Sequence, residues 1–182
     1  MKNIGCLGVI AAALLSGCQP RGPEVPRATS APPEEPVPAS AAVSMQNDSR
    51  YVLGGEGVLS LGALKGRVVL LDVMAAWSEP CRRDVPALNS LHEDFAAQGL
   101  AVVGLAVDRE PAAQVQAALQ QAGVIYPVAE GRPATLQALG GVRALPTRIL
   151  LDRKGVVRHT FAGAVPFEEI RTNVLALLRG EG

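Results

Sequence analysis

The sequence predicts an α/β domain built on a central mixed β-sheet flanked by helices. Two continuous apolar runs, 68–73 and 100–107, are typical of strands that are buried on both faces of a sheet. Segments with apolar residues at helical spacing follow these runs. Near the end, the turn sequence at 152–155 lies between two short apolar strands and predicts an antiparallel edge.

The expected helices each carry start or stop signals. After Cys81, apolar residues recur at helical spacing as far as Gly99. Proline near the start and glycine past the end delimit a second helix, from Pro111 to Gly123. A shorter helix is expected over 133–139, the hairpin strands over 149–151 and 156–161, and a final helix from 166 to about 180.

The sequence of residues 1–50 predicts segments that do not belong to this domain. Residues 1–18 have a basic start, a short apolar stretch and the sequence Leu15-Ser16-Gly17-Cys18, which resembles a bacterial lipobox. We therefore expect a lipoprotein signal peptide with Cys18 acylated, the alternative being an ordinary signal peptide cleaved nearby. Residues 19–50 hold half of the 14 prolines and are expected to be a disordered linker, which leaves 51–182 for the domain.

The charge balance and the number of cysteines limit the partners and the redox reactions that the chain can have. The 17 basic and 17 acidic residues balance, which argues against a nucleic-acid partner. If Cys6 is removed with the signal peptide and Cys18 is acylated, Cys81 is the one free thiol, so the mature chain forms no internal disulfide.

Two motifs carry a resemblance to a family. Trp77-Ser78-Glu79-Pro80-Cys81 lies between the first buried run and a helix, and Ala144-Leu145-Pro146-Thr147 comes before the hairpin. Together they resemble the W-C-x-P-C motif and cis-proline loop of thioredoxin-fold proteins of the exported TlpA/ResA-like kind. The resemblance covers about residues 55–180 and implies a thioredoxin fold and thiol:disulfide oxidoreductase activity, with neither metal nor cofactor.

The resemblance assigns a role to each catalytic position. Ser78 stands where the attacking cysteine is expected, Cys81 at the resolving position, Asp72 at the buried carboxylate below the site, and Pro146 at the cis bond. A serine hydroxyl ionises far less readily than a thiol, so we expect Ser78 to be a degenerate nucleophile. Burial should raise the pKa of Asp72, and Cys81 is either a shielded, slow thiol or a reactive one.

Beside this site, Trp77, Glu79, Pro80 and Leu145 are expected to frame a groove for an extended peptide. Three functions stay open: single-cysteine redox chemistry through Cys81 with an external thiol, a non-catalytic binding module, and, with less support, a peroxiredoxin-like peroxidase. Met74 argues against the last, because a proline is required there. The expected partners are exported protein or peptide thiols and disulfides and, through Cys18, the membrane of a bacterial envelope. Gln19 after Cys18 resembles outer-membrane sorting of a periplasm-facing lipoprotein.

Overall fold

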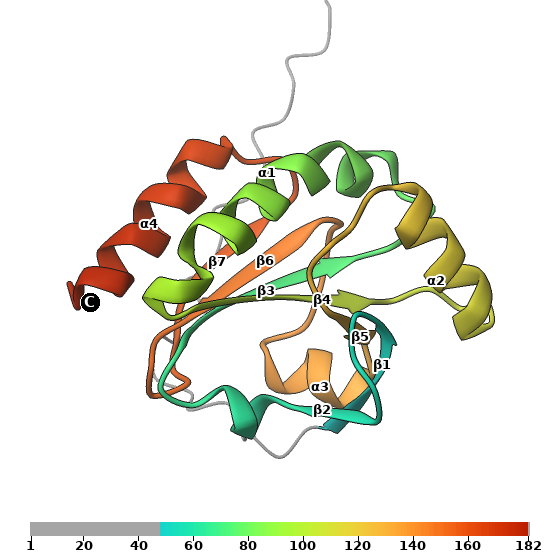
Figure 1. Ribbon diagram of the computed structural model, residues 1–182, viewed down its shortest axis with the longest axis horizontal. Coiled ribbons are helices and arrows are strands. Elements are labelled where there is room, and N and C mark those ends of the chain that lie inside the picture. The colour runs from blue at the N-terminus through green and yellow to red at the C-terminus, as the bar shows by residue number, and fades with distance from the viewer. Residues whose placement is uncertain (1–47, 182) are drawn as a thin grey trace, which may run out of the picture. The chain divides into compact units, whose positions relative to one another are not determined.

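The computed structural model describes residues 48–181, which form a seven-stranded mixed sheet with helices on both faces (Figure 1). The expected signal peptide, the acylated Cys18 and nearly all of the linker lie outside these residues. The strand order is β2-β1-β5-β4-β3-β6-β7. The strands are β1 (Asp48–Leu53), β2 (Val58–Ser60), β3 (Val68–Met74), β4 (Leu100–Ala106), β5 (Val128–Glu130), β6 (Thr147–Leu151) and β7 (Val157–Ala162).

The two buried runs form the centre of the sheet, as predicted. β3 pairs in parallel with β4, which pairs in parallel with β5, whereas β6 runs antiparallel to β3 and forms the closing hairpin with β7. The helices are α1 (Glu79–Phe95), α2 (Ala112–Gln121), α3 (Pro133–Ala138) and α4 (Phe167–Arg179), with short 3-10 turns at Leu61–Leu64 and Ala96–Gln98. Within residues 48–181, none of these helices has the length and apolarity needed to cross a bilayer.

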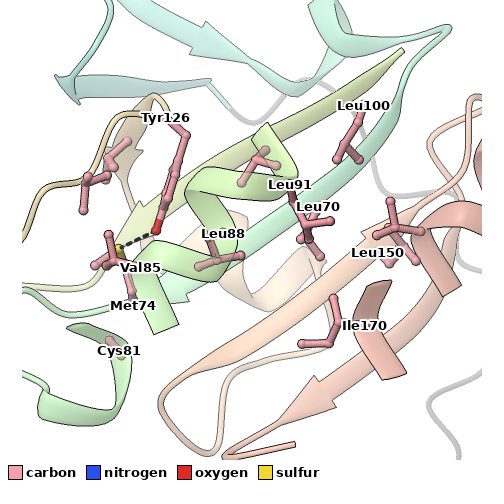
Figure 2. Packing of buried hydrophobic residues seen from close by; sticks show 14 of the residues in the cluster. Leu70, Met74, Cys81, Val85, Leu88, Leu91, Leu100, Tyr126, Leu150 and Ile170 are labelled. Carbon is pink, nitrogen blue, oxygen red and sulfur yellow. Dashed lines mark hydrogen bonds between the residues drawn. The ribbon is translucent and has the colours of Figure 1, made fainter. Parts of the chain in front are cut away.

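Alternate residues of β3 supply two separate cores. Leu70 and Met74 face the cluster that includes the buried residues of α1, α2 and α4 (Figure 2). Leu71 and Val73 belong to the other cluster, against which Leu136 of α3 packs. Helix α3 lies on the opposite side of the sheet from α1 and α4 (Figure 1). In Figure 2, Cys81 lies on α1 with the core residues Val85, Leu88 and Leu91. The period-two alternation of a strand and the helical repeat of α1 therefore place the cysteine over one face of the central strand.

The expected domain boundary at residue 51 falls within β1, which spans Asp48–Leu53. β1 begins at Asp48, inside the expected linker 19–50, and pairs with both β2 and β5. No strand was expected from the sequence at β1, β2 or β5. Two of these strands have only three residues, and β1 mixes charged and apolar residues, so none has the continuous apolar run that marks a buried strand.

Candidate functional site

The site begins at the turn that joins β3 to α1. Ser78 is the N-cap residue of α1, and its carbonyl accepts a hydrogen bond from the Arg82 N–H at 3.1 Å. Its own N–H donates to the Ala75 carbonyl at 3.0 Å, which closes the turn. The Ser78 side chain is buried and makes no capping hydrogen bond to the helix backbone. The hydroxyl instead forms a hydrogen bond with the side chain of Cys81.

Cys81 lies in the first turn of α1 and is fully buried. Burial raises the pKa of its thiol, and a hydrogen bond with the Ser78 side chain lowers it by a smaller amount. The N-terminus of a helix favours a thiolate, but removal from water opposes it, and here burial dominates. Burial and the raised pKa both favour the protonated, shielded form of the thiol, and the slow reactivity of Cys81 stays a prediction.

Below the helix, Asp72 on β3 faces Arg148 on β6, because the two residues are directly opposite in the antiparallel register. Both side chains are fully buried, and Arg148 Nε lies 3.2 Å from Asp72 Oδ1, an ion pair without the angle of a hydrogen bond. The Tyr126 hydroxyl donates to Asp72 Oδ2 at 3.2 Å. Burial raises the pKa of Asp72 to about 6, although Arg148 and Tyr126 favour its ionised form.

Arg148 also reaches α1. Its Nη2 donates to Asp84 Oδ2 at 2.7 Å, and Asp84 follows Cys81 by one helical turn. A buried guanidinium between two carboxylates thus ties the first turns of α1 to the central strands. This network was not predicted from the sequence, since Tyr126 and Arg148 lie far from Asp72 and Asp84 along the chain and come together with them only in the folded structure.

The proline loop lies at the same end of the sheet. Thr147, the first residue of β6, pairs with Val73, so the loop before it and the turn after β3 leave the sheet together. The Leu145–Pro146 peptide bond is cis, as the resemblance implies. Thr147 Oγ1 donates to the Ala144 carbonyl at 2.7 Å, and the Pro146 carbonyl accepts from the Gly163 N–H at 2.8 Å.

The outer surface of the turn carries one exposed apolar side chain, Trp77, and a charged pair formed by Glu79 and Arg82. Trp77 is 63% exposed, an unusual fraction for the largest apolar side chain. Glu79 is exposed and pairs with Arg82, with Oε2 and Nη2 2.6 Å apart. Pro80 and Leu145 are half-buried. Among the residues that the structure describes, no group of three or more His, Cys, Asp or Glu side chains could hold a metal ion.

The Redoxin family model matches residues 33–177 of the chain. Among curated proteins, the thiol-disulfide oxidoreductase ResA of Geobacillus thermodenitrificans is 28% identical over 110 residues, which are 60% of this chain and 63% of that protein. ResA of Bacillus anthracis is 30% identical over 112 residues, which are 62% and 64% of the two chains. The chain thus spans a little less than two thirds of these relatives.

Solved structures give the same result. A thioredoxin-family thiol:disulfide interchange protein of Chlorobium tepidum TLS has a TM-score of 0.66 and 26% identity, covering 78% of this chain and 99% of its own. A secreted thiol-disulfide isomerase of Corynebacterium glutamicum has the same score and identity, covering 74% and 84%. The chain belongs to the Redoxin family, with a thioredoxin-like fold similar to that of thiol-disulfide oxidoreductases.

Proposed function

We propose that the chain is an envelope-anchored, ResA-like thioredoxin-fold protein whose Ser78-Glu79-Pro80-Cys81 site runs no internal dithiol cycle. The observation that carries this is the helix start itself. Ser78 occupies the N-cap, the position expected for the attacking thiol, and Cys81, the single cysteine of residues 48–181, is buried behind it. A hydroxyl is a poor nucleophile toward a disulfide, and no histidine base is expected beside it.

Any redox role then requires a second sulfur from outside the chain. In the first step the Cys81 thiolate attacks a client disulfide, forming a mixed disulfide and releasing the other client sulfur as a thiolate. An external thiolate then attacks the client sulfur of the mixed disulfide, which releases Cys81 as its thiolate and leaves a disulfide between the client and the external thiol. The raised pKa and burial of Cys81 make the first step slow.

The burial of Cys81 favours a second candidate, a binding module that holds exported proteins without changing their redox state. The exposed ring of Trp77 and the neighbouring loop at Pro146 supply an apolar surface and a backbone edge suited to an extended peptide. A peroxidase has less support, because Met74 takes the position where a peroxiredoxin needs proline.

The location is part of the proposal. A signal peptide over 1–18, an acyl group on Cys18 and the linker 19–50 would hold the domain on the periplasmic side of a bacterial membrane, the outer membrane where Gln19 directs sorting. Clients would then be exported proteins or peptides with thiols or disulfides. Mass spectrometry of the purified full chain from membranes tests this, since a Cys18→Ser variant should lose the added lipid mass and leave the membrane fraction.

Reactivity of Cys81 separates the two candidates. The folded protein is mixed with an aromatic disulfide reagent, and mass spectrometry follows the modification of Cys81 over time. For the binding module we expect a rate at least about a hundredfold below that of the same chain in urea, since the thiol must be exposed before it reacts. Rapid stoichiometric modification of the folded chain would instead establish single-cysteine chemistry.

Restoring the missing thiol tests the site as a whole. A Ser78→Cys variant should form a disulfide with Cys81 and gain insulin-reductase activity, whereas the natural chain and the matched Ser78→Ala variant should have none. If the variant stays inactive with its disulfide formed, the surrounding surface, and not only the nucleophile, differs from that of the catalytic relatives.

A further inference from the structure

The peptide groups on either side of Ala76, just before Trp77, are held by side chains. The Ala76 N–H donates to both carboxylate oxygens of Asp108, at 3.0 and 3.1 Å. The Ala76 carbonyl accepts from Arg82 Nη1 at 2.9 Å. Arg82 is itself paired with Glu79. The backbone just before the exposed Trp77 ring is therefore bound on one side by Asp108, which follows β4, and on the other by Arg82 of α1.

Sheet topology explains why Asp108 reaches this turn. β3 and β4 are parallel neighbours, with Met74 opposite Ala106. The Val107 N–H donates to the Met74 carbonyl at 2.9 Å, so the pairing continues one residue past the strand. Asp108 and Ala76 each follow their own strand by two residues and so meet at the same end of the sheet. Hydrogen bonds to a charged acceptor are stronger than neutral ones, and the site is only partly open to water.

The arrangement suits a binding surface. An exposed aromatic ring contributes most to affinity when its backbone is already fixed, because binding then costs less conformational entropy. The Trp77 side chain is 63% exposed, and Asp108 and Arg82 restrain the residue that precedes it. The Trp77 backbone also interacts with the Asp108 carboxylate and lowers its pKa.

We propose that Asp108 and Arg82 are positioning residues that fix Trp77 for contact with an extended client peptide. The contact with a client rests on the proposed function, whereas the restraint on Trp77 does not. Glu110, in its own segment, is the charged group that acts on the Asp108 carboxylate. Arg82 binds the Ala76 carbonyl and pairs with Glu79 on α1. Burial raises the pKa of Asp108, the Ala76 N–H lowers it, and Glu110 raises it, with a net shift upward.

The chain has one tryptophan, so its fluorescence reports on Trp77 alone. Time-resolved anisotropy of the full chain is compared for wild type, Asp108→Ala, Asp108→Asn and Arg82→Met. For Asp108→Ala we expect a larger amplitude of fast Trp77 motion and at least tenfold faster amide exchange at Ala76. For Arg82→Met we expect smaller changes in both measurements. In wild type the fast motion of Trp77 should increase as the pH falls and Asp108 takes up a proton, at a higher pH than that at which a free aspartate titrates. The Asp108→Asn variant should lose this pH-dependent transition. The Glu110→Gln variant should retain it.

The matched control is Asp152→Asn. Asp152 also accepts from the backbone, from the N–H groups of Lys154 and Val156, but it lies in the β6–β7 turn, so this variant should leave Trp77 unchanged. If Asp108→Ala leaves anisotropy and Ala76 exchange at their wild-type values, the positioning role is wrong, whatever the protein binds.

Binding is measured separately, with reduced and carbamidomethylated insulin B chain as an extended peptide without thiols or disulfides. We expect Trp77→Ala to weaken binding at least tenfold and Asp108→Ala about three- to tenfold. Faster Trp77 motion with unchanged affinity would overturn the client contact. A wild-type chain that does not bind the peptide, with the anisotropy effects present, would overturn the binding function and leave the restraint on Trp77 established.

Discussion

The two sides of the first turn of α1 differ in their physical chemistry. On the outer side, the charged and aromatic side chains contact water: Trp77, Glu79 and Arg82. On the inner side, the polar groups lie in the core: Asp72, Cys81, Tyr126 and Arg148. Both sides contain an ion pair that includes an arginine, at 2.6 Å outside and 3.2 Å inside.

From their burial, we expect the shorter, exposed ion pair to contribute less to stability than the longer, buried one. Water screens the exposed Arg82–Glu79 pair, so its contribution to stability is small. The buried Arg148–Asp72 pair interacts in a medium of low polarity, where loss of either partner leaves an uncompensated charge. We therefore infer that the inner side determines stability and the state of Cys81, while the outer side is available for recognition.

The largest effect is expected for Arg148→Ala. This change leaves Asp72 buried without its cation and removes the contact to Asp84, so it should lower the free energy of unfolding by about 3–5 kcal/mol. Urea denaturation measures the loss. Adding Asp72→Asn should restore part of it, because the unpaired charge is then removed.

The control for this prediction is Arg158→Ala, which removes a partly exposed pair with Asp152 and should cost less than about 1 kcal/mol. Equal losses in the two variants would show that burial does not distinguish the ion pairs, and the contrast between the inner and outer sides would fail.

The second effect is a pH dependence from Asp72. Its pKa is about 6 in the folded chain against an ordinary 3.8, so the folded state binds the proton more tightly than the unfolded state. Stability linked to this group is therefore present at low pH and lost as the pH rises through about 6. Relative to Asp72→Asn, the wild type should gain roughly 2 kcal/mol between pH 7 and pH 4. A difference that is constant over this range would contradict the raised pKa.

A smaller effect is expected for Tyr126→Phe. The variant keeps the buried ring and removes only the hydroxyl that donates to Asp72 Oδ2, so it should cost about 1–2 kcal/mol at pH 7. Because the lost donor favours the ionised carboxylate, the Asp72 transition should move to higher pH. Tyr51→Phe, on the half-buried residue of β1, is the control that should leave this transition in place.

The smallest effect is expected on the outer side. Glu79→Ala removes the exposed pair with Arg82 and should change the free energy of unfolding by less than about 0.5 kcal/mol. Thermal unfolding at low and high salt measures it. A loss comparable to that of Tyr126→Phe would mean that the Glu79–Arg82 pair stabilises the helix start.

Sequence patterns predicted the parts of the site that depend on near neighbours. The buried strand β3 and the helix after it follow from apolar runs and helical spacing, and both motifs around Ser78 and Pro146 could be identified directly. The polar network could not be predicted in this way. Tyr126 meets Asp72 across 54 residues, Arg148 meets Asp84 across 64, and Asp108 meets Ala76 across 32.

By itself the sequence determined that the domain has a buried parallel centre and a closing hairpin, because strand and helix periodicities are local properties. It also determined that serine stands at position 78. Only the tertiary structure decided that Arg148 lies opposite Asp72, that Asp108 reaches the turn before Trp77, and that Cys81 is buried. Strand register and helix docking bring these groups together, and a one-residue shift in register would separate Asp72 from Arg148.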